Sequence, residues 1–214
     1  MGFFYISILS VVQGITEFLP VSSSAHLFLI SELTNQPAQN LQVDVAVHFG
    51  TLLAIILFYR NDTRVLLSGI QKTLTLTFNN SDTKFFHLIV IATAPIIFAG
   101  LFLKSTGLIY EIRSLKTIGY TMIIFGFILY LSDKYGKKNR FKDNWSYRDA
   151  FIMGLWQAIA LIPGTSRSGN TISGGLILGF SRECCVNLSL LMSIPTILAS
   201  SSLLLFDFIR TDFN

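Results

Sequence analysis

The residues best suited to chemistry lie in two polar interruptions of otherwise apolar sequence. In the first, Gln13 and Glu17 are four residues apart, so they share one face of a helix. Ser23 and His26 follow Pro20, and their spacing of three brings hydroxyl and imidazole within reach of each other. An ionisable group at membrane depth costs about 2.5 to 3.5 kcal/mol, which makes Glu17 a functional candidate. An interfacial carboxylate and a packing histidine are the alternatives.

The second interruption surrounds one arginine with hydroxyl groups and glycine: Ser166, Arg167, Ser168, Gly169 and Thr171. A guanidinium binds phosphate bidentately, and amides at a loop-to-helix junction bind anions with help from the helix dipole. This combination predicts a phosphate site. The sequence lacks the Gly-Lys-Ser/Thr ending of a nucleotide P-loop. The alternative is a structural ion pair between Arg167 and Glu17, which would still hold the two interruptions against each other.

The composition indicates that these interruptions belong to a membrane protein. Charged residues make up 13% of the 214 positions, about half the share of a soluble domain, and hydrophobic residues make up 51%. The mean hydropathy is +0.59. Disordered, collagen-like and coiled-coil chains are therefore excluded. The two cysteines, Cys184 and Cys185, are adjacent, which excludes a disulfide scaffold.

The net charge of +4 does not indicate a nucleic-acid partner. Six of the sixteen basic residues fall in the single segment 134–148. Loops rich in Lys and Arg remain on the cytoplasmic side of a membrane, so the segment predicts a cytoplasmic loop between two spans. Tyr130, Tyr135, Trp145 and Tyr147 flank it in the way that interfacial aromatic residues do.

The elements that must position the two interruptions are helices. Four stretches are apolar and about long enough to cross a bilayer, at roughly 20 residues each: 43–59, 85–103, 115–132 and 186–209. Residues 65–78 predict an interfacial amphipathic piece. Residues 3–33 and 150–180 are apolar but broken at 20–24 and 163–169, which favours two re-entrant half-helix pairs lining a polar cavity. Two ordinary loops between short helices are the alternative.

The two broken regions share an order of residues that indicates an internal repeat. Each has a glutamine, a half helix, a proline, a serine-rich loop and a second half helix, starting at Gln13 and at Gln157. Paired interruptions are typical of a midplane site between inverted repeats. We therefore predict one all-α, polytopic membrane domain. It comprises repeat one at about 1–132, a basic loop at 133–149 and a partial repeat two at 150–214, with two spans fewer than repeat one.

Both interruptions also resemble the signature motifs of a known family. The stretches QGITEFLPVSSSAH (13–26) and PGTSRSGNTISGG (163–175) are similar to those of the bacterial undecaprenyl-diphosphate phosphatases of the bacitracin-resistance type. The resemblance covers essentially the whole chain, but members typically continue through two further spans. It implies an inner-membrane, multi-pass hydrolase that recycles the lipid carrier of cell-wall synthesis. It further implies a polyprenyl diphosphate substrate, a site facing the periplasm, and interdigitated inverted repeats.

The resemblance also implies roles for single residues. Glu17, Ser23, His26, Arg167 and Thr171 match positions used for catalysis or phosphate binding, with Ser166 and Ser168 beside them. It implies a divalent cation, Mg²⁺ or Ca²⁺, which we expect Glu17 to hold together with Gln13. Arg167 and the amides near Gly169 would clamp the phosphate. We expect Ser23 or a water to attack, with His26 as general base or acid, and attack by a histidine is the remaining alternative.

Several alternatives stay open from the sequence. A polyprenyl-phosphate transporter or flippase would use the same repeats and anion clamp without hydrolysis. An inactive truncated homologue and a lipid phosphatase of the acid phosphatase superfamily are further options, and the chain could act as a homodimer. His48 and Asp44, four residues apart in a span, are expected to be supporting or packing groups, with a proton or metal path as the alternative. His87 and Asp207 are expected to be interfacial.

Overall fold

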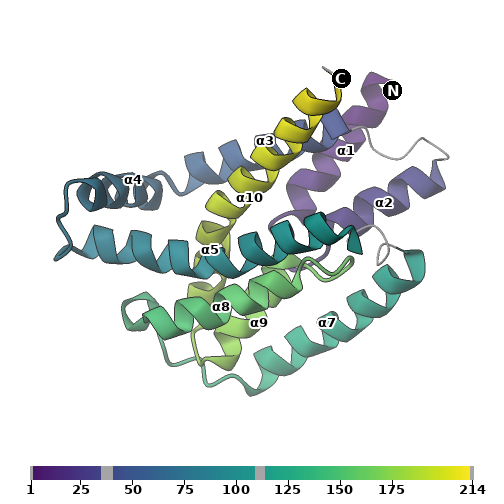
Figure 1. The fold of residues 1–214 in the computed structure, drawn as a ribbon. Coiled ribbons are helices and arrows are strands. Elements are labelled where there is room, and N and C mark those ends of the chain that lie inside the picture. Colours follow the sequence, from purple (N-terminus) through teal and green to yellow (C-terminus); the bar gives the residue numbers. More distant parts are fainter. Residues whose placement is uncertain (1, 35–40, 109–113, 213–214) are drawn as a thin grey trace.

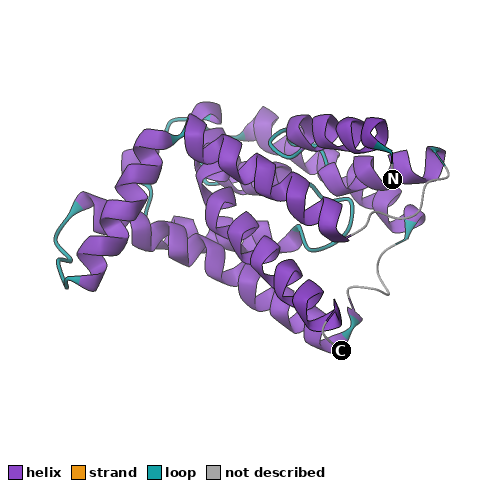
Figure 2. Cartoon of the chain, turned by 90° about the horizontal axis from the view of Figure 1, so that it is seen from above, coloured by secondary structure: helices purple, strands orange, loops and turns teal. Residues whose placement is uncertain are grey.

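The computed structural model describes residues 2–34, 41–108 and 114–212, which fold into α-helices and contain no strand. Figure 2 shows helices connected by short loops over this part of the chain. The expected all-α fold is confirmed. The helices are α1 (Phe3–Thr16), α2 (Ser23–Leu33), α3 (Leu41–Phe58), α4 (Arg60–Leu74), α5 (Ser81–Thr106), α7 (Leu115–Tyr135), α8 (Tyr147–Ile159), α9 (Arg167–Ile177) and α10 (Arg182–Asp212), with a 3₁₀ turn, η1, at Lys142–Asn144.

Three of the described helices are long and apolar enough to cross a membrane: Ser81–Thr106, Leu115–Tyr135 and the Arg182–Phe206 part of α10. They coincide with three of the four predicted spans, and the last starts four residues earlier than expected. The remaining prediction falls on α3, which has 18 residues. At about 1.5 Å per residue, α3 is slightly shorter than a bilayer core.

The two predicted interruptions each separate a pair of short helices. α1 and α2 have 14 and 11 residues, and α8 and α9 have 13 and 11. At about 1.5 Å per residue, none of the four could cross a bilayer core of roughly 30 Å alone. Serines begin the second helix of each pair, because Ser22 Oγ accepts the Ala25 amide and Ser166 Oγ accepts the Gly169 amide. The re-entrant course of these pairs through a bilayer stays a prediction.

Helices of the first half of the chain pack on helices of the second half. α5 lies along α8, α7 lies along α9, and α10 lies along α3 (Figure 1). Gly154 makes the α5–α8 approach possible, because a Cβ atom there would meet the Ala92 carbonyl oxygen at 2.6 Å. The largest cluster of buried residues includes Trp145, Met153 and Phe180 and lies between these same helices. The two halves of the sequence therefore form a shared core.

α4 begins earlier and ends earlier than the amphipathic piece predicted at 65–78. It follows α3 after a single residue, Tyr59, and packs along α5. Lys72 Nζ lies 2.7 Å from Asp82 Oδ2, and Ser68 Oγ donates to the same oxygen at 2.8 Å. Its interfacial position stays a prediction.

The basic segment is partly ordered as helix rather than as a loop over the whole of 133–149. α7 continues to Tyr135 and α8 already begins at Tyr147. Between them, Arg140 donates to both carboxylate oxygens of Asp149, at 3.0 and 2.6 Å. These hydrogen bonds raise the pKa of the Arg140 guanidinium above its ordinary value. The segment is therefore anchored to the start of α8.

Candidate functional site

The two interruptions, far apart in the sequence, are in direct contact. Arg167 Nη2 donates to Glu17 Oε1 at 2.8 Å, and Ser168 Oγ donates to the carbonyl oxygen of Leu19 at 2.6 Å. A Cβ atom at Gly169 would lie 3.4 Å from the Pro20 carbonyl oxygen, so the two loops approach closely there. Of the predicted site residues, Glu17, Arg167, Ser168 and Gly169 take part in this contact. The first loop thus supplies the carboxylate and the second loop supplies the cation.

Glu17 is the centre of the hydrogen-bonding network. Gln13 Nε2 and Ser23 Oγ each donate to Oε2 at 2.8 Å, while Arg167 binds Oε1. The Glu17 side chain is only 9% exposed. A carboxylate has about four lone-pair sites, so these three donors leave room for one more partner. The arrangement holds a carboxylate ready for a further ligand beside an oriented serine hydroxyl.

A small polar cavity opens beside this network, with a volume of about 200 Å³. Its lining comes from both loops and from α3, α5 and α10, and includes Glu17, Ser22, Ser23, Ser24, His48, Thr165, Ser166, Arg167, Thr196 and Ser200. Arg167 Nη1 and Gln13 Oε1 are buried and have no hydrogen-bond partner among the described residues. A buried guanidinium N–H without an acceptor is costly, so Arg167 is suited to bind an anionic oxygen from a ligand.

The predicted phosphate residues divide into two groups. Ser166 and Arg167 line the cavity. Ser168 donates to Leu19, and the Gly169 amide donates to Ser166 Oγ, so both already have partners. Thr171 is fully buried, and its hydroxyl donates to the Arg167 carbonyl oxygen one turn earlier. In this state Ser168, Gly169 and Thr171 therefore support the loop and the first turn of α9 instead of facing the cavity.

The two histidines near the site are placed differently from expectation. His26 Nδ1 donates to the Ser22 carbonyl oxygen at 2.7 Å, and His26 is not among the residues that line the cavity. His48 does line it, with Nε2 4.0 Å from Glu17 Oε2. The sequence already indicates a role for His48, because an ionisable residue within an apolar span is a functional candidate. The side chains of Asp44 and Asp207 lie outside the described residues.

A further contact fixes the second loop from behind. Gly164 has a φ of +92° and lies tightly against Ile118 and Thr121 of α7, where a Cβ atom would clash with backbone. Thr121 Oγ1 donates to the Pro163 carbonyl oxygen at 2.6 Å. The sequence gives Thr121 no visible role, since it is one polar residue in an apolar span. α7 therefore positions the loop that carries Arg167.

The donors at this site fit a hard divalent cation only in part. Among the described residues, no group of three or more His, Cys, Asp or Glu side chains is close enough to hold a metal ion. Glu17 has room for another partner, and the buried Gln13 Oε1 has no donor. Mg²⁺ and Ca²⁺ prefer such oxygen ligands, and Mg²⁺ in particular completes its shell with water and substrate phosphate. Glu17 lines the cavity and so fits an ion that is shared with a phosphorylated ligand, whereas Gln13 is fully buried and does not line it.

Comparison with known proteins agrees with the motif resemblance. The family described as "Bacitracin resistance protein BacA" matches residues 6–213. The chain is 48% identical to an "Undecaprenyl-diphosphatase" of Jannaschia sp. (strain CCS1) over 94% of its own length and 75% of that protein. It is likewise 43% identical to an "Undecaprenyl-diphosphatase" of Alcanivorax borkumensis, covering 95% of this chain and 76% of that protein. The chain belongs to the bacitracin resistance protein BacA family.

Proposed function

We propose that this chain hydrolyses undecaprenyl diphosphate to undecaprenyl phosphate and inorganic phosphate. The names of its relatives in two genera support the reaction and the substrate. The reaction regenerates the lipid carrier for cell-wall synthesis and thereby confers resistance to bacitracin. The transporter alternative explains the same polar cavity but not those names.

One observation carries the proposal more than any other. Arg167 presents a buried Nη1 without an acceptor at a polar cavity, while its Nη2 is fixed by Glu17. A guanidinium held in this way is already oriented for the terminal phosphate, and its charge offsets the charge that develops on the transferring phosphoryl group. α9 begins at Arg167, so the positive end of the helix dipole also lies at this point.

Ser23 is the proposed nucleophile and Glu17 the proposed proton acceptor. Ser23 Oγ already donates to Glu17 Oε2 at 2.8 Å. As Ser23 Oγ attacks the terminal phosphorus, its proton passes to Glu17, the bond to the bridging oxygen breaks, and undecaprenyl phosphate leaves. Water then attacks the phosphoserine, the Ser23 Oγ–phosphorus bond breaks, Glu17 returns its proton to Ser23 Oγ, and inorganic phosphate is released. His26 Nδ1 donates to the carbonyl oxygen of Ser22, the residue before Ser23, and so helps to position the nucleophile.

A divalent cation would be held by Glu17 and Gln13. The remaining lone pair of Glu17 and the buried Gln13 Oε1 are the donors that support this assignment. When bound, Mg²⁺ or Ca²⁺ supplies positive charge against the diphosphate oxygens. Arg167 would bind phosphate oxygens as well.

The proposed location is the bacterial inner membrane, with the site open to the periplasmic side. The basic segment at 134–148 supports this orientation, since cytoplasmic loops carry the excess of Lys and Arg. The basic segment follows the C-terminal end of α7. Thr121, which donates to the Pro163 carbonyl oxygen, lies nearer the N-terminal end of α7, which begins at Leu115. The site and the basic segment thus lie toward opposite ends of α7.

Phosphate release from a long-chain isoprenyl diphosphate tests the proposal. The purified chain in detergent, with Mg²⁺ or Ca²⁺, should release phosphate, and the Arg167→Ala variant should not. Arg60→Ala changes an exposed arginine outside the site and is the matched control. Equal release by Arg167→Ala and the unaltered chain would contradict the role of the clamp. Movement of the lipid across vesicles without any phosphate release would favour the transporter.

A further inference from the structure

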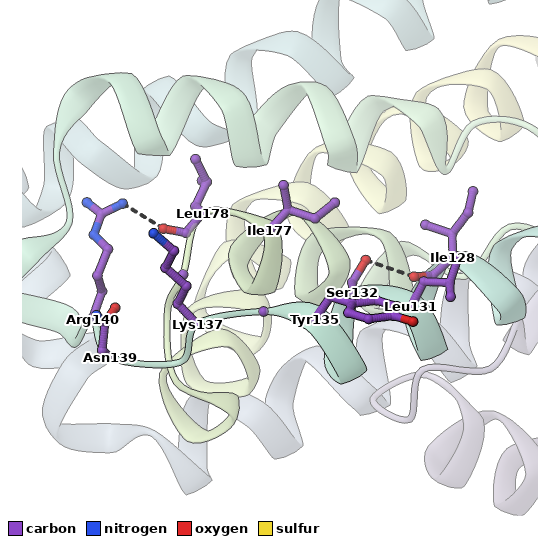
Figure 3. A pocket seen from close by; sticks show the side chains of 11 residues that line it. Ile128, Leu131, Ser132, Tyr135, Lys137, Asn139, Arg140, Ile177 and Leu178 are labelled. Carbon is purple, nitrogen blue, oxygen red and sulfur yellow. Dashed lines mark hydrogen bonds between the residues drawn. The ribbon is translucent and has the colours of Figure 1, made fainter.

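A second and larger pocket lies at the other end of α9 from Arg167. Its volume is about 910 Å³, and it opens between the last turns of α7, the loop that follows, and the end of α9 (Figure 3). Its lining residues include Ile128, Leu131, Tyr135, Lys137, Arg140 and Ile177. Because α9 has 11 residues, its two ends are roughly 16 Å apart. The pocket is therefore separate from the site that contains Glu17.

The pocket has an apolar end and a cationic end. Figure 3 shows Ile128 and Leu131 of α7 at one end, and the side chains of Lys137 and Arg140 extending in the same direction at the other. Ile177 lies between them and is exposed to the surroundings. A ligand that fills this pocket must combine an apolar portion with an anionic group. A soluble nucleotide or peptide does not match a wall of this kind.

The charges around the cationic end do not cancel. Arg140 is neutralised by Asp149, and Asp133 is shared by Lys138 and Arg182. Lys137 is exposed and makes no ion pair within the described residues. Lys134 Nζ lies over the rings of Tyr130 and Tyr135, at 5.7 and 5.5 Å from the ring centroids. The pocket thus has an excess of positive charge beside the interfacial aromatic residues.

The pocket is preformed by backbone contacts. The amides of Asn139 and Arg140 both donate to the Gly179 carbonyl oxygen at 3.0 Å, and the Ser181 amide donates to the Arg140 carbonyl oxygen at 2.9 Å. A Cβ atom at Gly136 would meet the Leu176 carbonyl oxygen at 2.8 Å, so the chain after α7 lies directly against α9. A rigid wall of this kind needs little ordering when a ligand binds.

We propose that this pocket binds an anionic phospholipid of the surrounding bilayer. The headgroup phosphate would bind Lys137, with Lys134 adding long-range attraction, and one acyl chain would lie along Ile128, Leu131 and Ile177. Basic pockets between membrane helices on the cytoplasmic side are suited to anionic headgroups. A zwitterionic lipid could place its acyl chain against the same apolar residues, but the cation of its headgroup would be repelled by Lys137. The site therefore discriminates by headgroup charge.

Native mass spectrometry of the purified chain tests this proposal with two lipids of identical acyl chains. Phosphatidylglycerol should be retained in preference to phosphatidylcholine. Since one lysine near a membrane surface contributes about 1 kcal/mol, Lys137→Ala should weaken phosphatidylglycerol binding by about fivefold. Ile177→Trp should narrow the apolar part of the pocket and weaken lipid binding, and because Ile177 is exposed, this variant should fold normally. Lys116→Ala, in the first turn of α7 and away from the pocket, is the matched control and should bind normally.

Three results would overturn the proposal. They are equal retention of the two lipids, equal weakening by Lys137→Ala and Lys116→Ala, and displacement of phosphatidylglycerol from the pocket by a polyprenyl monophosphate. The test is independent of phosphatase activity, because Arg167→Ala should retain phosphatidylglycerol as the unaltered chain does. Loss of hydrolysis with normal lipid retention, or the reverse, would therefore separate the two proposals.

Discussion

Arg167 Nη2 lies 2.8 Å from Glu17 Oε1, although 150 positions separate the two residues in the chain. Both side chains are largely buried, at 13% and 9% exposure. The pair gains its Coulomb attraction at a considerable desolvation cost, so it is a weak source of net stability. Its value lies in positioning, because both residues line the same cavity and Arg167 Nη1 has no hydrogen-bond partner among the described residues. The following predictions test this arrangement.

Arg167→Lys should lower phosphate release by about a hundredfold or more while the protein folds normally. Lysine keeps the charge but cannot bind Glu17 and a phosphate oxygen through one planar group. Steady-state assays of phosphate release, with size-exclusion chromatography as the folding check, measure this. Arg60→Lys is the matched control outside the site. Near-normal turnover in Arg167→Lys would remove Arg167 from the phosphate clamp.

Glu17→Gln should abolish the dependence on Mg²⁺ or Ca²⁺ together with most of the rate. The amide removes the negative charge that a hard cation prefers and weakens the acceptor for Ser23. Rates measured over a titration of each cation, and Mn²⁺ binding followed by electron paramagnetic resonance, provide two readouts. Glu32→Gln is the control, since Glu32 is exposed on α2. A variant with unchanged cation dependence would exclude Glu17 as a ligand.

Ser23→Ala should lose activity by at least about a hundredfold, and Ser24→Ala should lose little. Ser23 donates to Glu17, whereas the Ser24 hydroxyl is hydrogen-bonded to the Ser22 hydroxyl. Rapid quenching of the unaltered chain with labelled substrate should trap a phosphorylated serine that is absent from Ser23→Ala. Repeated failure to find this species in an active preparation would argue for direct attack by water.

His26→Ala should lower turnover, and His26→Asn should restore much of it. His26 Nδ1 donates to the Ser22 carbonyl oxygen, and an asparagine side-chain amide can donate to the same oxygen. Rescue by asparagine would show that His26 positions the first turn of α2. If both variants are equally inactive, His26 acts by proton transfer instead, as the motif resemblance first suggested.

Gly154→Ala should destabilise the fold by about 1 to 3 kcal/mol through overpacking. The added methyl group would meet the Ala92 carbonyl oxygen at 2.6 Å, and backbone atoms cannot move aside as a flexible side chain would. Gly119→Ala has open space around its Cβ and should cause no loss. Thermal unfolding in detergent compares the two. Equal melting temperatures would show that the added methyl group can be accommodated between α5 and α8 without loss of stability.

Much of the architecture could be read directly from local sequence. Apolar runs of about the length of a bilayer core identified three of the long helices, since this signal depends only on composition and length. Pro20 and the serines after it, and the corresponding loop from Pro163, identified where the short helices end and begin again. The residues of the candidate site were found for the same reason, because polar groups are conspicuous in an apolar chain.

Only the tertiary structure decided how these residues are used. Whether Ser23 reaches Glu17 depends on how α2 is placed against the end of α1, which helical spacing alone does not fix. The entry of His48 into the cavity depends on how α3 packs, and the support of Arg167 by Thr121 depends on the contact of α7 with a loop some forty residues later. The sequence determined which groups are available, because local patterns dictate helices and their breaks. Long-range packing decided which of those groups meet.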